Sequence, residues 1–268
     1  MIWNLIRFGG RFYTLSVIAV ILAPLLVSLI FSFNADRFPS LPLKGFTLEW
    51  YVLTFTDPLV LDSLKRSFMV AIPVGLLSTV LGFAAAYSDY RYSFRGKSIF
   101  ILLMLLPPTI PAVIMGLAML SYLSRVDLAG NVYSIFICHV VTGLPFAMAL
   151  IRLRLSQMDP SLEQAAWNLR ASSLQSLRYV VIPFCAQSLV AAFLITTAIS
   201  FDEFAVAWFV SGLEETVPVR VLVFLQGQVS PRINAIGTAV FATSILLVVL
   251  AMAFSGLGKT IRSKPAGS

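Results

Sequence analysis

Charged residues are scarce in this sequence. Asp, Glu, Lys and Arg make up 12% of its 268 residues, whereas hydrophobic residues make up 59%. A soluble domain carries roughly 25% charged residues, and the mean hydropathy here is correspondingly high, at +0.91. These values exclude an ordinary soluble domain and indicate an integral membrane protein.

Side chains suited to metal or redox chemistry are equally few. The chain has one histidine, His139, and two cysteines, Cys138 and Cys185. They offer no metal-ligand spacing and no disulfide framework, and no apolar run holds the paired carboxylates of a membrane enzyme. A histidine inside a membrane helix acts either as a proton relay or as a hydrogen-bond partner for another helix. Because its run contains no acid, we favour the second role for His139.

Six long runs contain no charged residue at all. Each is 22 to 27 residues long, and a helix needs about 20 residues to cross the hydrocarbon core. The first run is longer than the roughly 7–15 residues of a signal-peptide core, so we expect a retained helix there. We predict an all-α membrane protein of about six transmembrane helices, with spans at 12–33, 67–88, 98–123, 131–151, 180–201 and 233–256.

The basic residues predict the orientation of these spans. With the N-terminus inside, the cytoplasmic side receives 12 of the 19 basic residues and three of the 12 acids, so its net charge is +9 and that of the outer side is −2. Lys and Arg are enriched in cytoplasmic loops, so both termini are expected in the cytoplasm. The same bias explains the basic pI without a nucleic-acid partner.

Three prolines interrupt the third run, at Pro107, Pro108 and Pro111. Each removes a backbone donor and clashes with the preceding turn. Broken helices at membrane depth occur where they line a cavity or pack against protein. This pattern indicates either a packing kink or a flexible element beside a translocation path, and the residues favour neither.

The predicted cytoplasmic segment 152–182 is too long for a tight connection and carries helix signals. Either Asp159 caps a helix that Pro160 opens, or Ser161 and Gln164 form a capping box. The apolar positions then recur every three or four residues on one face, at Leu162, Ala165, Ala166 and Leu169. Lipid binding favours larger side chains than alanine, so this shallow face indicates docking into a groove of a partner protein.

The same segment resembles the EAA loop of binding-protein-dependent ABC importer permeases. That family has an acid and paired alanines, then Leu-Gly-Ala, then an apolar-Pro pair, here Ile182-Pro183. The resemblance implies a type I ABC importer permease fold with a cytoplasmic coupling helix that sits in a cleft of the ATP-binding subunit. The implied ATPase-coupling residues are Glu163, Gln164, Ala165, Ala166, Leu169, Arg170 and Ala171.

Arg170 departs from the family pattern, which has glycine at this position. Glycine permits a positive-φ turn between two short helices, and arginine there costs about 1 kcal/mol or more. We therefore expect either a turn with αR-like geometry or a straighter helix.

Two further stretches resemble the C-type permease of spermidine/putrescine importers: residues 200–204 (Ser-Phe-Asp-Glu-Phe) and 230–235 (Ser-Pro-Arg-Ile-Asn-Ala). Within the first, Asp202 and Glu203 end an apolar run near the outer boundary. They are either solvated loop carboxylates or part of a solute path. In the second case they would attract a polyamine, and Trp208 and Phe209 could add cation–π contacts.

The resemblance also implies the organisation and partners of the chain. We expect an N-terminal helix and periplasmic loop (1–63), a core permease domain (64–258, with the coupling segment at 159–182) and a cytoplasmic tail (259–268). The expected partners are an ATP-binding subunit that acts as a dimer, a second permease subunit that forms a heterodimer with this chain, a periplasmic solute-binding protein and membrane lipid. The location implied is the bacterial inner membrane.

The chain is expected to bind no cofactor and to catalyse nothing itself, with ATP and Mg on the partner ATPase. The stretch 256–260 (Gly-Leu-Gly-Lys-Thr) ends like a phosphate-binding loop, but Ala253 stands where the first glycine is required. The function expected is therefore that of a permease subunit importing a small solute, such as a polyamine. The alternatives are another small organic solute or ion, or a self-sufficient secondary transporter, which would need charged residues within its spans.

Overall fold

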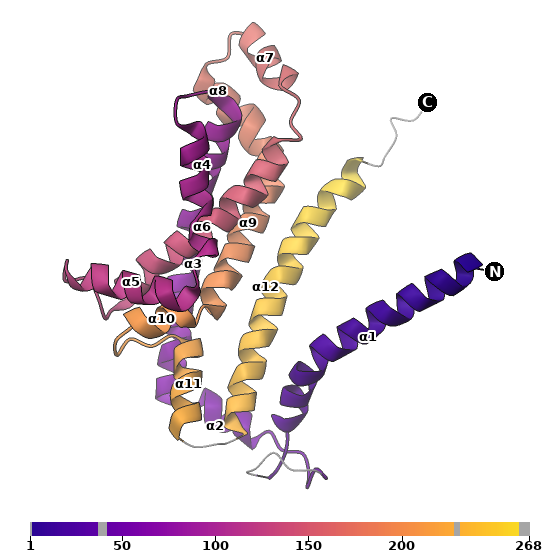
Figure 1. Cartoon of the computed structure of the whole chain (residues 1–268), viewed down its shortest axis with the longest axis vertical. Helices are drawn as coiled ribbons and strands as arrows, with labels where there is room; N and C mark the ends of the chain where they lie inside the picture. The colour runs from indigo at the N-terminus through magenta and orange to yellow at the C-terminus, as the bar shows by residue number, and fades with distance from the viewer. Residues whose placement is uncertain (1, 37–41, 228–230, 263–268) are drawn as a thin grey trace. The chain divides into compact units, whose positions relative to one another are not determined.

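The computed structural model describes residues 2–36, 42–227 and 231–262, and within them the secondary structure is helical apart from one isolated bridge between Asn34 and Phe46 (Figure 1). The predicted all-α class is confirmed. The elements in chain order are α1 (Ile2–Phe31), α2 (Glu49–Phe55), α3 (Pro58–Arg91), α4 (Lys97–Leu105), a 3-10 turn (Pro107–Thr109), α5 (Ala112–Ser124), α6 (Val132–Leu155), α7 (Ser161–Asn168), α8 (Ser173–Ser176), a π-helical turn (Leu177–Val181), α9 (Ile182–Asp202), α10 (Ala205–Val210), α11 (Val217–Gly227) and α12 (Arg232–Arg262).

Five helical stretches in the described part of the chain are long and apolar enough to cross a membrane. They match five of the six predicted spans, and they extend over Gly9–Phe31, Pro58–Arg91, Val132–Leu155, Ser173–Asp202 and Arg232–Phe254. Several are longer than the predicted spans because the helices continue into charged residues at their ends.

The predicted span 98–123 is not one continuous helix. Helix α4 ends at Leu105, the 3-10 turn holds Pro107 and Pro108, and α5 begins only at Ala112. Ile110 is extended, with φ −89° and ψ 129°, as expected for a residue whose αR conformation is disfavoured by a following proline. The prolines therefore cause a complete break rather than a kink, and Figure 1 shows α4 and α5 running in different directions.

The chain divides into two compact units. Unit 1 comprises Met1–Asp62 and Arg220–Ala242, and unit 2 comprises Ser63–Val219 and Thr243–Ser268. In unit 1 the chain after α1 folds back on itself: the Trp50 indole N–H donates to the Asn34 carbonyl oxygen over 2.7 Å. Asp57 and Arg232 form an ion pair in the same unit.

Unit 2 is built around α3, α6 and α9. Helix α3 approaches the other two at glycines: a Cβ on Gly75 would lie 2.0 Å from the Thr197 hydroxyl of α9, and one on Gly82 would lie 2.8 Å from the Ala147 Cβ of α6. Small residues at such points let membrane helices pack closely. Helices α5 and α10 pack against each other beside this group.

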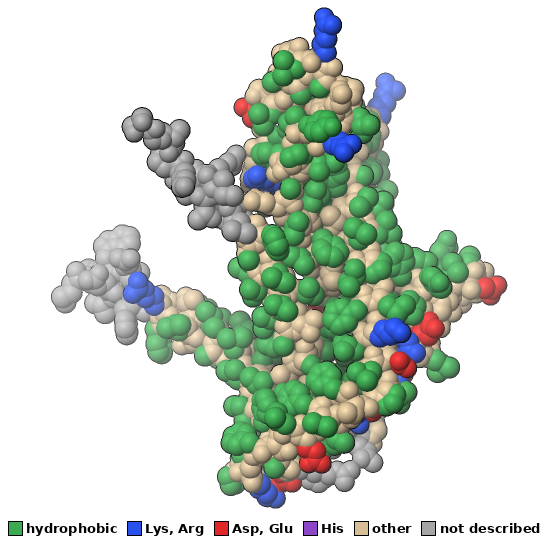
Figure 2. All heavy atoms as spheres, turned by 180° about the vertical axis from the view of Figure 1, so that it is seen from behind, with side chains coloured by type: hydrophobic (Ala, Val, Ile, Leu, Met, Phe, Trp, Pro, Cys, Tyr) green, Lys and Arg blue, Asp and Glu red, His purple; other side chains and the backbone are tan. Residues whose placement is uncertain are grey.

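The outward surface of α3 is apolar, with large exposed side chains spaced by three and four residues. They are Met69, Ile72, Leu76 and Val80. Figure 2 shows hydrophobic side chains over much of the visible helix surface, with few charged side chains among them. Such a surface suits contact with lipid or with another membrane helix.

Two predictions fall partly outside the described residues. Of the expected tail 259–268, residues 259–262 complete α12 and residues 263–268 are outside the described part. Ser230, which opens the second polyamine-permease stretch, is also outside it, and α12 begins two residues later at Arg232.

Candidate functional site

The predicted coupling segment forms a short helix, α7, at the end of unit 2 where α6 stops. The Asp159 carboxylate accepts a hydrogen bond from the Ser161 backbone N–H over 2.9 Å, and Pro160 directly precedes the helix. The bond is the one expected of the first predicted capping mode, although the helix begins at Ser161, one residue later than predicted, with Pro160 at the capping position. The hydrogen bond stabilises the ionised carboxylate, so the pKa of Asp159 lies below its ordinary value.

Arg170 makes a left-handed turn, with φ 63°. Both expectations for this residue, an αR-like turn and a straighter helix, are therefore wrong. The Arg170 N–H donates to the Trp167 carbonyl over 2.8 Å, and the Ala171 N–H donates to the Ala166 carbonyl over 3.0 Å. This pair of bonds is the Schellman motif, which usually has glycine at the left-handed position. Two satisfied carbonyls at the helix end offset the strain of about 1 kcal/mol.

A second capping motif follows this turn and starts α8. The Ser172 hydroxyl accepts from the Gln175 N–H over 3.2 Å, and the Gln175 side-chain oxygen accepts from the Ser172 N–H over 2.7 Å. This reciprocal pair is a capping box. The segment is therefore a helix–turn–helix unit with both junctions fixed by its own residues.

Glu163 points into unit 2 and is 3% exposed. Its Oε1 accepts hydrogen bonds from the Tyr87 hydroxyl over 3.2 Å and from the Ser176 hydroxyl over 3.3 Å. The acid of the EAA-like motif thus attaches α7 to α3 and α8. Its contact with an ATPase stays a prediction, and in this structure the carboxylate is not on the surface that such a partner would meet.

The remaining coupling residues lie mostly on the outside of α7. Gln164, Ala165 and Arg170 are exposed, whereas Ala166 and Ala171 are half-buried. Leu169 is 84% exposed and Leu174, on α8, is 73% exposed. A surface that combines small side chains with projecting leucines suits insertion into a groove of another protein.

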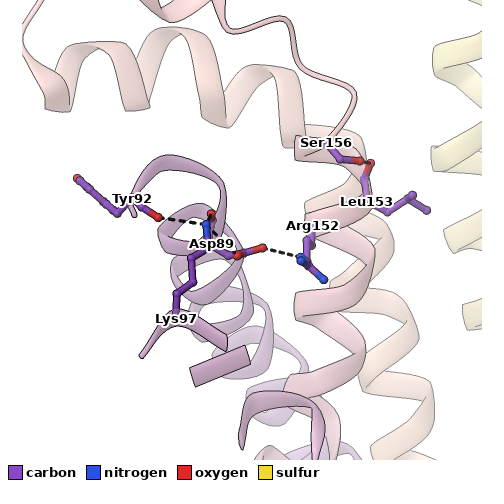
Figure 3. A network of polar contacts seen from close by, with 6 residues as sticks. All are labelled: Asp89, Tyr92, Lys97, Arg152, Leu153 and Ser156. Atoms are coloured by element: carbon purple, nitrogen blue, oxygen red, sulfur yellow. Dashed lines mark hydrogen bonds and ion pairs between the residues drawn. The ribbon is translucent and has the colours of Figure 1, made fainter. Parts of the chain in front are cut away.

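A buried carboxylate next to this segment links the ends of three helices (Figure 3). Asp89, near the end of α3, forms an ion pair with Arg152 of α6, with 2.5 Å between Oδ2 and Nε. Its Oδ1 lies 3.2 Å from the Lys97 Nζ at the start of α4. The same ammonium donates to the main-chain carbonyls of Asp89 and Tyr92.

The four predicted solute-path residues have different environments at the junction of α9 and α10. The side chain of Asp202 is exposed, and its Oδ1 accepts from the Ser244 hydroxyl over 2.7 Å. Glu203 accepts from the Val206 N–H over 2.9 Å and so caps α10. Trp208 is 37% exposed, whereas Phe209 packs toward Gly116 of α5. Of the four residues, Asp202 and Trp208 are exposed, and their contact with a solute stays a prediction.

His139 connects two helices of unit 2, as predicted. Its Nδ1 lies 2.9 Å from the hydroxyl oxygen of Ser200, and both residues are buried. The bond joins α6 to α9. In the described residues no group of three or more His, Cys, Asp or Glu side chains is placed to hold a metal ion.

The sequence of this chain was compared with protein families and with individual proteins. The model of the family described as "Binding-protein-dependent transport system inner membrane component" matches residues 78–263. The chain belongs to this family. Permeases of this family are non-catalytic, multi-pass subunits of inner-membrane ABC importers, in which ATP is hydrolysed by a separate subunit.

Individual relatives of the permease agree with this assignment. The spermidine/putrescine transport system permease protein PotC of Haemophilus influenzae is 31% identical over 235 residues, which cover 87% of this chain and 91% of that protein. PotC of Escherichia coli K12 is 28% identical over 250 residues, 93% of each chain. A solved bacterial ABC transporter that imports the polysaccharide alginate matches with a TM-score of 0.64 at 17% identity, over 93% of this chain and 95% of its own. The predicted permease fold is confirmed.

Sequence reasoning about the permease missed the anchoring of its coupling segment. Asp89 is one of the three acids on the predicted cytoplasmic side, and an isolated acid among many cations is itself a signal of pairing. The Ser172–Gln175 spacing is that of a capping box and is a second signal in the sequence. The contact between Tyr87 and Glu163 joins residues that are 76 positions apart, and no local sequence pattern predicts it.

Proposed function

We propose that this permease imports a polyamine, such as spermidine or putrescine, delivered by a periplasmic binding protein. The observation that carries the proposal is the similarity to spermidine/putrescine permeases over nearly the whole chain. Both relatives described above are named for that transport, and the similarity includes the segments that form unit 2.

The chemistry of the α9–α10 junction supports a cationic solute. The exposed Asp202 carboxylate supplies a negative charge, and the exposed face of Trp208 suits an alkylammonium group through cation–π attraction. Glu203 and Phe209 act in this proposal as supports, because the first caps α10 and the second packs against α5. Ionisable residues in membrane segments mark solute paths, and Asp202 is such a residue at the end of α9.

The proposed energy input is at the other end of unit 2. The exposed face of α7 docks on an ATP-binding subunit, which works as a dimer. Because this subunit lies in the cytoplasm, α7 and both termini of the permease are on the cytoplasmic side. A second, different permease subunit completes the transport path. ATP drives the cycle only by binding one conformation of this assembly more tightly than the other.

The test is solute uptake by the reconstituted complex with its binding protein in liposomes. ATP-dependent uptake of radiolabelled spermidine, competed by putrescine and not by sulfate, is expected. Asp202→Asn should raise the spermidine concentration needed for half-maximal uptake. The matched control Glu49→Gln changes an exposed acid on α2 and should leave this concentration unchanged.

Two results would contradict the proposal. Competition by an anionic or neutral solute but not by putrescine would show a permease for another substrate class. Uptake by the chain alone, without ATP, would favour a self-sufficient transporter.

A further inference from the structure

The last turn of α3 contacts the coupling helix through two side chains. The Tyr87 hydroxyl donates to Glu163 near the start of α7, and the Arg91 guanidinium lies 4.3 Å from the ring centre of Trp167 near its end. Tyr87 and Arg91 are four residues apart, so they project from the same face of α3. Both ends of α7 are therefore held by a single helical turn.

These contacts cross between segments that are far apart in the sequence. Helix α7 is joined by short connections to α6 before it and to α8 and α9 after it. Helix α3 ends about 70 residues before α7 starts, so the chain itself does not carry a movement of α7 to α3. The Glu163 and Trp167 contacts provide a direct side-chain link between the two.

Asp89 lies between these two residues and projects from a different side of the turn, because positions two apart do not share a helix face. Its side chain is 8% exposed and is paired with Lys97 of α4 and Arg152 of α6. One face of the turn thus holds the coupling helix, and another holds the adjacent ends of α4 and α6. Figure 3 shows Asp89 between the two cations.

The rest of α3 packs closely against two other helices of unit 2. At Gly82 and Gly75 its backbone is in direct contact with α6 and α9. Close-packed interiors transmit a shift rather than dissipate it. A movement of the last turn would therefore pass along α3 to the helices that lead to the α9–α10 junction.

We propose that the turn Tyr87–Arg91 is the transmission element of this permease, with Tyr87, Asp89 and Arg91 as positioning residues. It converts a displacement of α7 into a joint displacement of α3, α4 and α6. This inference rests on the proposed docking of α7 on an ATPase. It assigns the buried acid of the motif, Glu163, to the link with α3 and leaves the exposed face of α7 to the partner.

The test measures solute transported per ATP hydrolysed by the complete complex in liposomes. Tyr87→Phe removes only the hydroxyl that reaches Glu163. The ATPase should still copurify and hydrolyse ATP, while transport per ATP falls by about threefold to tenfold, the range expected from the net contribution of one typical hydrogen bond. Tyr92→Phe is the matched control, because Lys97 contacts the main-chain carbonyl of that residue, which the change keeps.

A double-mutant cycle distinguishes transmission from general destabilisation. If Tyr87 acts through Glu163, the pair Tyr87→Phe and Glu163→Gln should lower transport per ATP no further than the stronger single change. Asp89→Asn should lower the same ratio independently. Should Asp89→Asn fail to assemble, the Tyr87 and Glu163 cycle decides alone.

The outcomes separate this inference from the proposed function. Wild-type transport per ATP in Tyr87→Phe, or multiplicative effects in the cycle, would overturn the transmission role while leaving ATPase docking intact. If no ATPase copurifies with the unmodified chain, that result would instead contradict the proposed function on which the inference rests.

Discussion

The acidic residues at the two ends of unit 2 differ in their burial and in their hydrogen-bond partners. At the α7 end, Asp89 and Glu163 are buried, and each makes side-chain contacts with two other elements. At the α10 end, Asp202 is exposed. Glu203 is half-buried, and its Oε1 accepts a hydrogen bond from the Val206 N–H in the first turn of α10. The first end is built to hold a helix in a fixed position, whereas the second presents a carboxylate at the surface. Similar residue types therefore anchor helices at one end, whereas one of them lies exposed at the other.

The largest expected effect comes from removing the buried charge at the α7 end. Asp89→Asn leaves Lys97 and Arg152 beside each other without their counter-charge. Losing one partner of a fully buried pair costs roughly 3–5 kcal/mol, and since both cations are partly exposed we expect about 2 kcal/mol here. Thermal unfolding of the purified complex in detergent measures this change. Asp62→Asn, which alters an exposed acid on the same helix, should leave the melting temperature within error.

A pair of matched changes tests the comparison itself. Glu163→Gln should lower stability by about 1 kcal/mol, because an amide is a weaker acceptor for the Tyr87 and Ser176 hydroxyls. Asp202→Asn should leave stability almost unchanged and weaken solute uptake. The melting temperature and the uptake affinity are measured on both variants. The account is contradicted if the two substitutions change these two quantities in the same way.

A smaller effect of opposite sign is expected at the left-handed turn. Arg170→Gly relieves a positive-φ strain of about 1 kcal/mol, although the greater freedom of glycine in the unfolded chain offsets part of this gain. We expect a net stabilisation of about 0.5 kcal/mol. Arg178→Gly, in a helical turn, should destabilise by about 1 kcal/mol. A lower melting temperature for Arg170→Gly would show that the arginine side chain itself stabilises the turn.

The smallest effect concerns the cap of α7. The pKa of Asp159 is lowered in the native protein by its hydrogen bond to the Ser161 N–H. Its contribution is therefore present above the ordinary pKa of about 3.9 and is lost as pH falls through the lower native value. Asp159→Ala should be slightly less stable than the parent at neutral pH, and the difference should vanish in strong acid. A difference that grows as pH falls would contradict this sign.

The sequence allowed the membrane class and the position of α7 to be predicted, because both depend on local patterns. Charge-free runs locate spans through hydropathy alone, and Asp159-Pro160 followed by apolar positions spaced by three and four residues predicts a short helix. The broken span at 106–111 was visible as three prolines, but whether prolines kink or interrupt a helix depends on the surrounding packing.

Arg170 and Glu163 show where local reasoning failed. At Arg170 the expected strain did not prevent a left-handed turn, because two backbone hydrogen bonds of the Schellman motif offset it. At Glu163 the motif identified the residue but not the direction of its side chain, which is set by Tyr87 on a distant helix. Long-range contacts of this kind have no signature in a single sequence.

The central claim is that the exposed face of α7 connects this permease to an ATPase, and affinity purification of the tagged chain in mild detergent tests it most directly. We predict that an ATP-binding subunit and a second permease copurify with the parent chain, and that Leu169→Asp, at a leucine of this surface that is 84% exposed, releases the ATPase while the second permease stays bound. Retention of the ATPase by Leu169→Asp at the parent level, or purification of the parent chain without any ATPase, would contradict the account.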